Sequence, residues 1–221
     1  DFCLSRGLGD VYKRQVQDWP IPGEVLPQNI GTMKWDGKIP FKHTEKLSIK
    51  RSDDFDEDCL APQWQWNYQP RKDYFSLTER PGWLRLKAYR PLETNNLLKA
   101  GNTLTQRTFR KQNNDVTIKM DISNMQDGQK NGLCHFSSQH SAIGIVKEED
   151  ACYLEYRKNG NITKGIQIHS EFVWFRTEWG MDGKSQYYYS LDGDNFLPFG
   201  EKYQLTWGNY RGDRIGIYCF N

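Results

Sequence analysis

The strongest constraint on the fold is a series of short segments in which apolar and polar residues alternate. Residues 116–120 place Val116, Ile118 and Met120 on one side of an extended strand, and residues 83–87 and 214–220 show the same period of two. No stretch of ten or more residues keeps a 3.6-residue period, so almost no helix is expected. The chain is therefore predicted to be all-β.

Turn signals separate the alternating segments. Asp-Gly or Asn-Gly pairs stand at 127–128, 159–160, 182–183 and 192–193, and the runs 185–191 and 196–199 around the last pair form the clearest predicted hairpin. Strands at a spacing of roughly 8–12 residues indicate a β-sandwich or barrel. A propeller would need a repeat of about 40–50 residues. Because no such repeat occurs from residue 52 onward, we predict one two-sheet sandwich over residues 52–221.

The first 51 residues differ from the rest. Residues 1–15 contain neither the apolar segment of a signal peptide nor a regular period; they resemble translated adapter sequence, and a disordered native terminus is the alternative. Residues 16–51 contain four prolines and three glycines, too many for a packed element. They are predicted to be an interdomain linker.

The charge balance excludes several function classes. Thirty Lys and Arg against 28 Asp and Glu give a net charge of +2, far from the concentrated positive charge that binds a phosphate backbone. The sequence contains no run of about 18 apolar residues, so no membrane-spanning helix is predicted. Neither a phosphate-binding glycine loop nor a G-x-S-x-G motif occurs. We therefore expect no nucleic-acid partner, no membrane partner and no nucleotide chemistry.

Cysteine and histidine spacing does not predict a metal site. Cys134, Cys152 and Cys219 lie in apolar segments and outside any C-x-x-C pair, so they are predicted to be small buried hydrophobic residues. His135 and His140 are five residues apart, which is not a recognised ligand spacing, and are predicted to have polar roles at strand edges. No metal ligand is assigned.

A run of acidic residues spans 53–58. Neighbouring side chains on a strand point to opposite faces, so consecutive carboxylates cannot form the spaced pair that glycoside hydrolysis requires. A solvated turn is the favoured interpretation, with a Ca²⁺ site and a catalytic role as the alternatives. No cofactor is predicted.

The aromatic content is high, with 8 Trp, 12 Tyr and 11 Phe. Trp64, Trp66 and Tyr68 alternate with amide residues at 63, 65 and 67, so a strand here would carry three rings on one face and three amides on the other. Flat rings stack on the C–H face of a sugar, while amides bind its hydroxyls. The alternative is that these tryptophans fill the core of the sandwich.

Five separated motifs carry a resemblance to a known family; they are residues 53–87, 102–109, 131–145, 187–200 and 210–221. In this order they resemble the C-terminal β-sandwich of glycoside hydrolase family 43 enzymes, the β-xylosidase and α-L-arabinofuranosidase group. The resemblance implies a concanavalin A-like sandwich that packs against an N-terminal five-bladed propeller. In that family the catalytic carboxylates lie in the propeller, and none of them corresponds to a residue of this chain. The chain alone is therefore expected to be an inactive gene fragment.

The resemblance also implies one more strand. The family pattern continues through a glycine-rich turn into a final strand, whereas this sequence stops at Asn221. We expect the last strand of the sandwich to be missing, which would expose the hydrogen-bonding groups of its neighbour.

The resemblance implies an accessory role in hydrolysing xylan or arabinoxylan oligosaccharides, in which the sandwich positions carbohydrate and completes the rim of the active site. The expected partners are xylo- or arabinoxylo-oligosaccharide and the catalytic propeller, and an extracellular or periplasmic location is favoured over a cytoplasmic one. The candidate sugar contacts are Trp64, Trp66, Asn67, Gln106 and Arg107. The alternatives are a structural brace that binds no sugar and a free-standing lectin-like enzyme with its own carboxylate pair.

Overall fold

The computed structural model describes residues 15–16, 19–20, 51–109, 111–208 and 212–221. The chain divides into two compact units, Asp1–Ile49 and Lys50–Asn221. The described residues of the first unit form one short antiparallel pair, β1 (Gln15–Val16) and β2 (Trp19–Pro20). Apart from these four residues and Arg51, the predictions for residues 1–15 and 16–51 lie outside the described residues.

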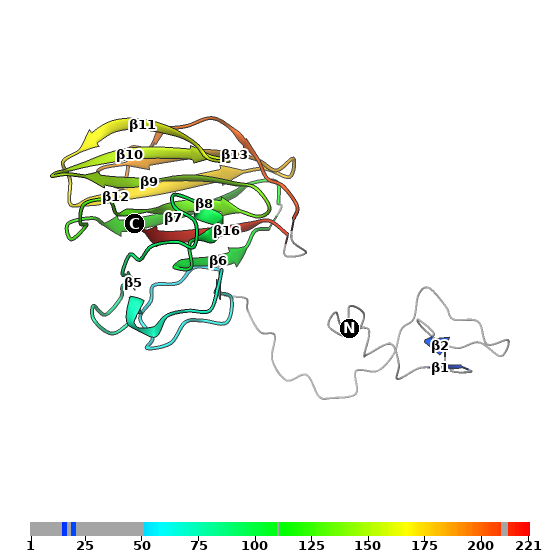
Figure 1. The fold of residues 1–221 in the computed structure, drawn as a ribbon. Helices are drawn as coiled ribbons and strands as arrows, with labels where there is room; N and C mark the ends of the chain where they lie inside the picture. Colours follow the sequence, from blue (N-terminus) through cyan, green and yellow to red (C-terminus); the bar gives the residue numbers. More distant parts are fainter. Residues whose placement is uncertain (1–14, 17–18, 21–50, 110, 209–211) are drawn as a thin grey trace. The chain divides into compact units, whose positions relative to one another are not determined.

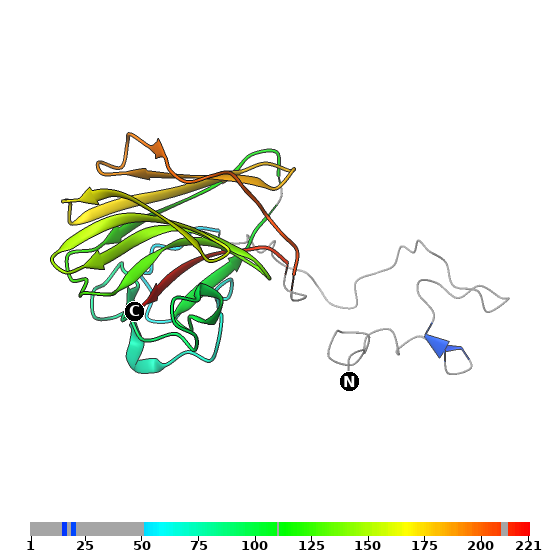
Figure 2. The same cartoon turned by 45° about the horizontal axis from the view of Figure 1, so that its top comes forward.

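The second unit contains two antiparallel sheets that face each other (Figures 1 and 2). The larger sheet has seven strands in the order β11-β10-β9-β8-β16-β6-β3, and the smaller one has the order β14-β13-β12-β7, with β15 paired to β13. The strands β4 and β5 form a separate two-stranded pair. The bounds are β3 Gln65–Trp66, β4 Phe75–Ser76, β5 Arg85–Leu86, β6 Thr103–Arg107, β7 Asn114–Asp121, β8 Lys130–Phe136, β9 His140–Glu148, β10 Ala151–Lys158, β11 Asn161–Ile168, β12 Phe172–Trp179, β13 Lys184–Ser190, β14 Leu197–Pro198, β15 Tyr203–Gln204 and β16 Arg214–Phe220.

This architecture confirms the prediction of an all-β two-sheet sandwich. Among the described residues the only helical pieces are two single 3₁₀ turns, η3 (Lys72–Tyr74) and η4 (Leu97–Lys99). No helix in the described part of the chain is long and apolar enough to cross a membrane.

The period-two segments place their apolar residues in the core between the sheets. In β7, Val116, Ile118 and Met120 pack against the main core cluster, while the residues between them are exposed. Residues from both sheets form the centre of this cluster, including Leu133, Ile143, Leu154, Val173, Phe175 and Tyr187, none more than 1% exposed. Of residues 83–87, only Arg85–Leu86 enters a ladder.

The predicted turns are confirmed by backbone geometry. Gly128, Gly160, Gly183 and Gly193 all have positive φ, between 73° and 91°, a region that residues with a Cβ rarely adopt. The turn at 192–193 lies between β13 and β14, which pair as predicted for the hairpin.

The predicted position of His135 at a strand edge is wrong. His135 is fully buried in β8, which has β9 on one side and β16 on the other. Its Nε2 lies 2.9 Å from Thr177 Oγ1, and its ring meets the Trp179 ring edge-on. Burial lowers the pKa of His135 to about 3. The ring is therefore neutral at pH 7 and serves as a core residue with one polar contact.

The prediction of buried cysteines holds for Cys134 and Cys219, which are 0% and 8% exposed. Cys152 is half-buried and packs against the main core cluster. Burial raises the pKa of the Cys219 thiol to about 12, so this thiol stays protonated at neutral pH.

The outer face of the larger sheet has its own cover. Leu97 and Ala100, from the segment that contains η4, form a second buried cluster with Phe136, Tyr218 and Phe220. The ion pair between Glu155 and Arg157 lies on the same face, and both residues are buried. Arg157 also donates to the carbonyl of Asn95 in the covering segment, at 3.3 Å. This part of the sheet is therefore sealed from solvent.

Close packing on this face depends on glycine. A Cβ added to Gly144 in β9 would collide with the Asn131 carbonyl and the Tyr218 hydroxyl. The strand can pass beneath the tyrosine only because it has no side chain there.

The smaller sheet ends at β7. In the part of the chain that the structure describes, β7 pairs with β12 on one side and with no strand on the other. The expected further strand beyond Asn221 stays a prediction.

Candidate functional site

The predicted sugar contacts lie at the edge of the larger sheet, where β3 pairs with β6. Gln65 is opposite Thr105, and Trp66 is opposite Leu104. Because β3 is only two residues long, the expected alternation of three rings and three amides does not extend along a strand. Trp64 and Trp66 are half-buried, whereas Tyr68 is 39% exposed.

Contacts within the domain involve the three candidates near β3. Trp64 Nε1 donates to Asp53 Oδ2 at 2.6 Å, and the Trp64 ring stacks on Phe55. The Trp66 ring packs against Phe75, with ring centroids 4.8 Å apart. These contacts join the edge of the larger sheet to the segment around Asp53 and Phe55 and to β4.

The Asn67 amide is also used inside the domain. Its Nδ2 donates to the carbonyls of Leu98, at 3.0 Å, and Ala100, at 3.1 Å. Asn67 therefore fastens β3 to the segment that covers the larger sheet. Its side-chain oxygen is the remaining group that a ligand could contact.

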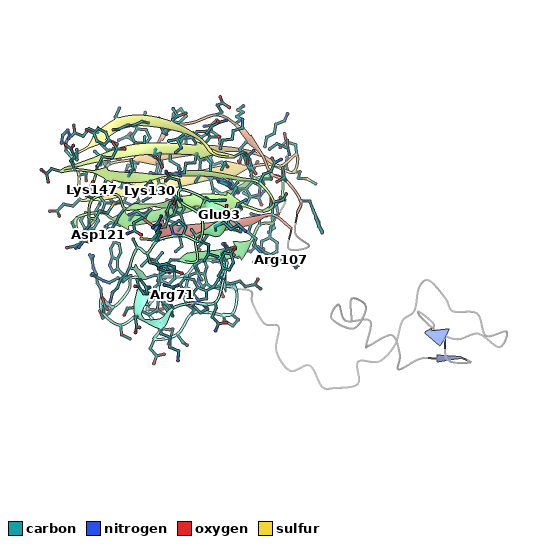
Figure 3. All side chains as sticks on the ribbon, in the orientation of Figure 1. Arg71, Glu93, Arg107, Asp121, Lys130 and Lys147 are labelled. Atoms are coloured by element: carbon teal, nitrogen blue, oxygen red, sulfur yellow. The ribbon has the colours of Figure 1, made fainter. Side chains whose placement is uncertain are left out.

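The two candidates on β6 point away from each other. Gln106 is opposite Ile215 and Arg107 is opposite Arg214, so consecutive side chains lie on different faces of the sheet. Arg107 is exposed at the end of β6 (Figure 3). The structure thus places Trp64, Trp66 and Asn67 along the sheet edge, but the Asn67 amide turns toward the covering segment while the Trp64 and Trp66 rings contact other residues. Gln106 and Arg107 lie on the next strand, on opposite faces of the sheet. Sugar contact by these residues stays a prediction.

The acidic run has a structural use at its first residue. Asp53 accepts hydrogen bonds from the backbone N–H of Phe55 and from Trp64 Nε1. Within the described ranges no group of three or more His, Cys, Asp or Glu could hold a metal ion. The calcium alternative stays a prediction.

One surface hollow lies beside the free edge of β7 and has a volume of about 950 Å³. Its walls include Leu84 and Leu86 from the β5 region, Ile118 and Met120 from β7, and Ile217 from β16. Charged residues surround this apolar floor, and Arg80 is paired with Asp121 at one end. This hollow therefore combines an apolar surface with a charged and polar surround.

The second hollow lies on the outer face of the smaller sheet and has a volume of about 860 Å³. We call it the sheet-face groove and define it by Asp115, Arg176, Glu178, Gln186, Tyr188 and Lys202, which all line it. Arg176 is opposite Tyr188, and Glu178 is opposite Gln186, in the pairing of β12 with β13. Because Phe175 and Tyr187 point into the core, these four side chains point outward.

Sequence reasoning missed this groove, although part of its signal was present. In β12 the outward residues Trp174, Arg176 and Glu178 alternate with Val173, Phe175 and Thr177, which are fully buried. The alternation identifies an outward row, but only the pairing of β7, β12 and β13 joins that row to Asp115 and Tyr188. Partial burial and the negative charge of Glu178 raise the pKa of Tyr188, which keeps its hydroxyl protonated as a hydrogen-bond donor.

Comparison with known proteins gives one family. Residues 52–221 match the family GH43_C2, described as the Beta xylosidase C-terminal Concanavalin A-like domain. A "Beta-xylosidase" of Formosa agariphila is 33% identical over 227 residues, covering 93% of this chain and 38% of that protein. A "Putative beta-xylosidase" of Xylanibacter ruminicola is 30% identical, covering 90% of this chain and 36% of that protein. The chain thus spans less than two fifths of these relatives.

Solved structures show the same fold. A bifunctional GH43-CE protein of Bacteroides eggerthii matches with a TM-score of 0.70 and 26% identity, covering 94% of this chain and 27% of that chain. The GH43 BlXynB protein of Bacillus licheniformis matches with a TM-score of 0.65 and 24% identity, covering 80% of this chain and 37% of that chain. The concanavalin A-like sandwich predicted from the sequence motifs is confirmed, and the chain belongs to the family of C-terminal concanavalin A-like domains of β-xylosidases.

Proposed function

We propose that this chain is the C-terminal accessory domain of a β-xylosidase-type glycoside hydrolase, where it positions xylan or arabinoxylan oligosaccharides and completes the rim of the active site. The observation that carries the proposal is the family match over residues 52–221, supported by the relative named "Beta-xylosidase" at 33% identity. The reaction needs two carboxylates at a fixed separation across the glycosidic bond, and we assign these to the catalytic domain of the longer protein.

A domain-exchange experiment tests the accessory role. In the Formosa agariphila relative, the C-terminal domain is replaced by residues 52–221 of this chain, and hydrolysis of an aryl β-xyloside is compared with that of the intact and the truncated relative. We expect the exchanged protein to be active and the truncated one to lose activity. An exchanged protein that is folded but no more active than the truncated one contradicts the accessory role.

The chain alone provides a second test. With the catalytic carboxylates elsewhere, it should release no aryl alcohol from an aryl xyloside. Turnover by the purified chain, abolished by substitution of one of its own carboxylates, would instead support a free-standing enzyme.

A structural brace that binds no sugar is the second candidate. It is favoured by the internal contacts of Trp64 and Asn67, whose side chains hold the edge of the larger sheet together. The two roles differ in one measurement, because a brace shows no saturable response to xylo-oligosaccharide at millimolar concentration.

A further inference from the structure

We propose that the sheet-face groove is the oligosaccharide-binding site of this domain and takes a neutral xylan-type chain. The inference rests on the proposed function, since the substrate class comes from there. It moves the sugar site from the edge of the larger sheet to the outer face of the smaller one. At about 860 Å³, the groove has the size of known ligand clefts, which are roughly 300–1,000 Å³.

The groove presents hydrogen-bonding groups that the described part of the protein leaves available. Arg176 uses its Nε to donate to Thr117 Oγ1 at 2.9 Å and lies over the Phe196 ring, so its Nη atoms remain for a ligand. Gln186 uses Nε2 for the carbonyls of Tyr187 and Gly200, which leaves its side-chain oxygen as an acceptor. These contacts fix the side chains in place and leave their outward atoms free.

Carboxylates add strong acceptors beside these donors. Glu178 and Asp115 are opposite each other in the pairing of β12 with β7. Neither forms an ion pair with a described residue; burial, together with the charge of Glu178 and its hydrogen bond with the Tyr188 hydroxyl, raises the pKa of that hydroxyl. A sugar hydroxyl can donate to a carboxylate and accept from a guanidinium at the same time. The arrangement therefore suits a polyhydroxylated ligand.

Charge balance in the groove indicates a neutral ligand. Its lining contains three acidic residues, Asp115, Glu178 and Asp182, and three basic residues, Arg176, Lys184 and Lys202. Equal numbers of opposite charges attract neither a polyanion nor a polycation strongly. A protein partner would need an apolar centre, but apart from Trp179 and Gly180 every lining residue has a polar side chain.

Tyr188 supplies the aromatic surface. It is half-buried and lines the groove opposite Arg176 on the neighbouring strand. The sheet supports the Tyr188 ring. The ring can stack on the C–H face of a sugar while its hydroxyl stays among the polar groups of the groove. This combination of one ring with fixed polar groups is what the edge site around Trp64 lacks, because the polar atoms there are largely engaged.

The test is a titration of the full chain, labelled with ¹⁵N, with xylohexaose, followed by NMR. The Gln186 side-chain amide lines the groove, whereas Trp64 lies at the edge site, so the amide and indole signals report on the two positions separately. We expect saturable shifts at the Gln186 amide, with the Trp64 indole unmoved. An anionic oligogalacturonide of equal length is expected to bind more weakly.

Matched variants separate groove binding from non-specific association. Glu178→Gln and Tyr188→Ala should each weaken xylohexaose binding by about tenfold or more, the effect of one lost charge-assisted bond or one stacked ring. The controls Glu148→Gln and Tyr153→Ala change the same residue types on the larger sheet and should leave the affinity unchanged. Unchanged thermal midpoints in all four variants show that each one is folded.

The outcomes distinguish this inference from the proposed function. Shifts confined to Trp64, or tighter binding of the anionic oligomer, overturn the groove as a neutral-sugar site but leave the accessory role intact. No saturable shift at millimolar xylohexaose overturns the groove and the sugar-positioning role together, and favours the brace. An inactive domain-exchange protein overturns the accessory role whatever the titration gives.

Discussion

The substitution Tyr187→Phe tests how the two sheets are joined. Tyr187 lies in β13 of the smaller sheet and is fully buried, and its hydroxyl reaches the larger sheet. That hydroxyl donates to the Ser141 carbonyl at 2.8 Å and accepts from the His135 backbone N–H at 2.9 Å, with Ser141 Oγ 3.0 Å away. The phenylalanine keeps the ring in the core, so the change removes one oxygen and leaves its partners in place.

The expected cost follows from those partners. A buried donor or acceptor left without a partner costs about 1–3 kcal/mol, and here one donor and one acceptor lose the same oxygen. We expect the free energy of unfolding to fall by about 2–6 kcal/mol, with the thermal midpoint falling by roughly 2–4 °C for each kcal/mol in a domain of this size. Urea unfolding followed by tryptophan fluorescence measures the change.

The neighbouring Tyr188→Phe is the matched control. Its hydroxyl faces outward on the same strand, so the loss should stay below about 0.5 kcal/mol. If Tyr187→Phe costs no more than this control, the hydroxyl does not hold the sheets together and the reasoning fails.

Three other predictions concern the core and the edge of the sandwich. Burial lowers the pKa of His135 to about 3 and that of His140 to about 4. As the pH drops below about 6.5, these histidines are protonated in the unfolded chain but not yet in the folded one. The free energy of unfolding should therefore fall by about 1.4 kcal/mol per pH unit for each histidine. Urea midpoints that stay constant between pH 7 and pH 5 would contradict this. Gly144→Ala should greatly reduce soluble expression or lower the thermal midpoint, because the new Cβ has no space. Gly180→Ala is the control and should be tolerated, since the atom nearest to its new Cβ is 3.3 Å away. Equal midpoints for the two variants would refute the packing argument. Asn67→Ala removes two hydrogen bonds to backbone carbonyls. It should lower the free energy of unfolding by about 1–2 kcal/mol and leave the affinity for xylohexaose unchanged. A loss of affinity with unchanged stability would instead place the sugar site at the sheet edge.

Much of the fold could be predicted because it follows from local chemistry. Val116, Ile118 and Met120 alternate with polar residues since one face of β7 is buried and the other meets solvent. Gly128 and Gly193 stand where the backbone needs a positive φ, and those turns set the lengths of the strands between them. Both signals can be recognised within a few residues of sequence.

The position of His135 could not be predicted in the same way. Its neighbours in sequence do not reveal that β8 is a central strand, because β16, some 80 residues further along, supplies one of its two partners. Similarly, the alternation at residues 63–68 suggests a strand, but the Asn67 side chain turns toward the covering segment and the ladder ends at Trp66.

The sheet-face groove depends on pairing between distant strands. Arg176 meets Thr117, 59 residues earlier, and Tyr188 on the following strand. Neither spacing is a motif, so the groove appears only when the register of the three strands is known.

The position of β16 also has a consequence for the order of folding during synthesis. The strands from β7 to β13 pair with close neighbours in sequence or with one another, but β6 joins the larger sheet only through β16, with Arg107 paired to Arg214. Contacts over such long separations form slowly because a large loop must close first. On the ribosome, β6 and β3 can pair with each other, but they cannot join the rest of the larger sheet until Arg214–Phe220 has been synthesised. Cellular chaperones are therefore expected to bind this domain mainly at its N-terminal strands, β3 and β6.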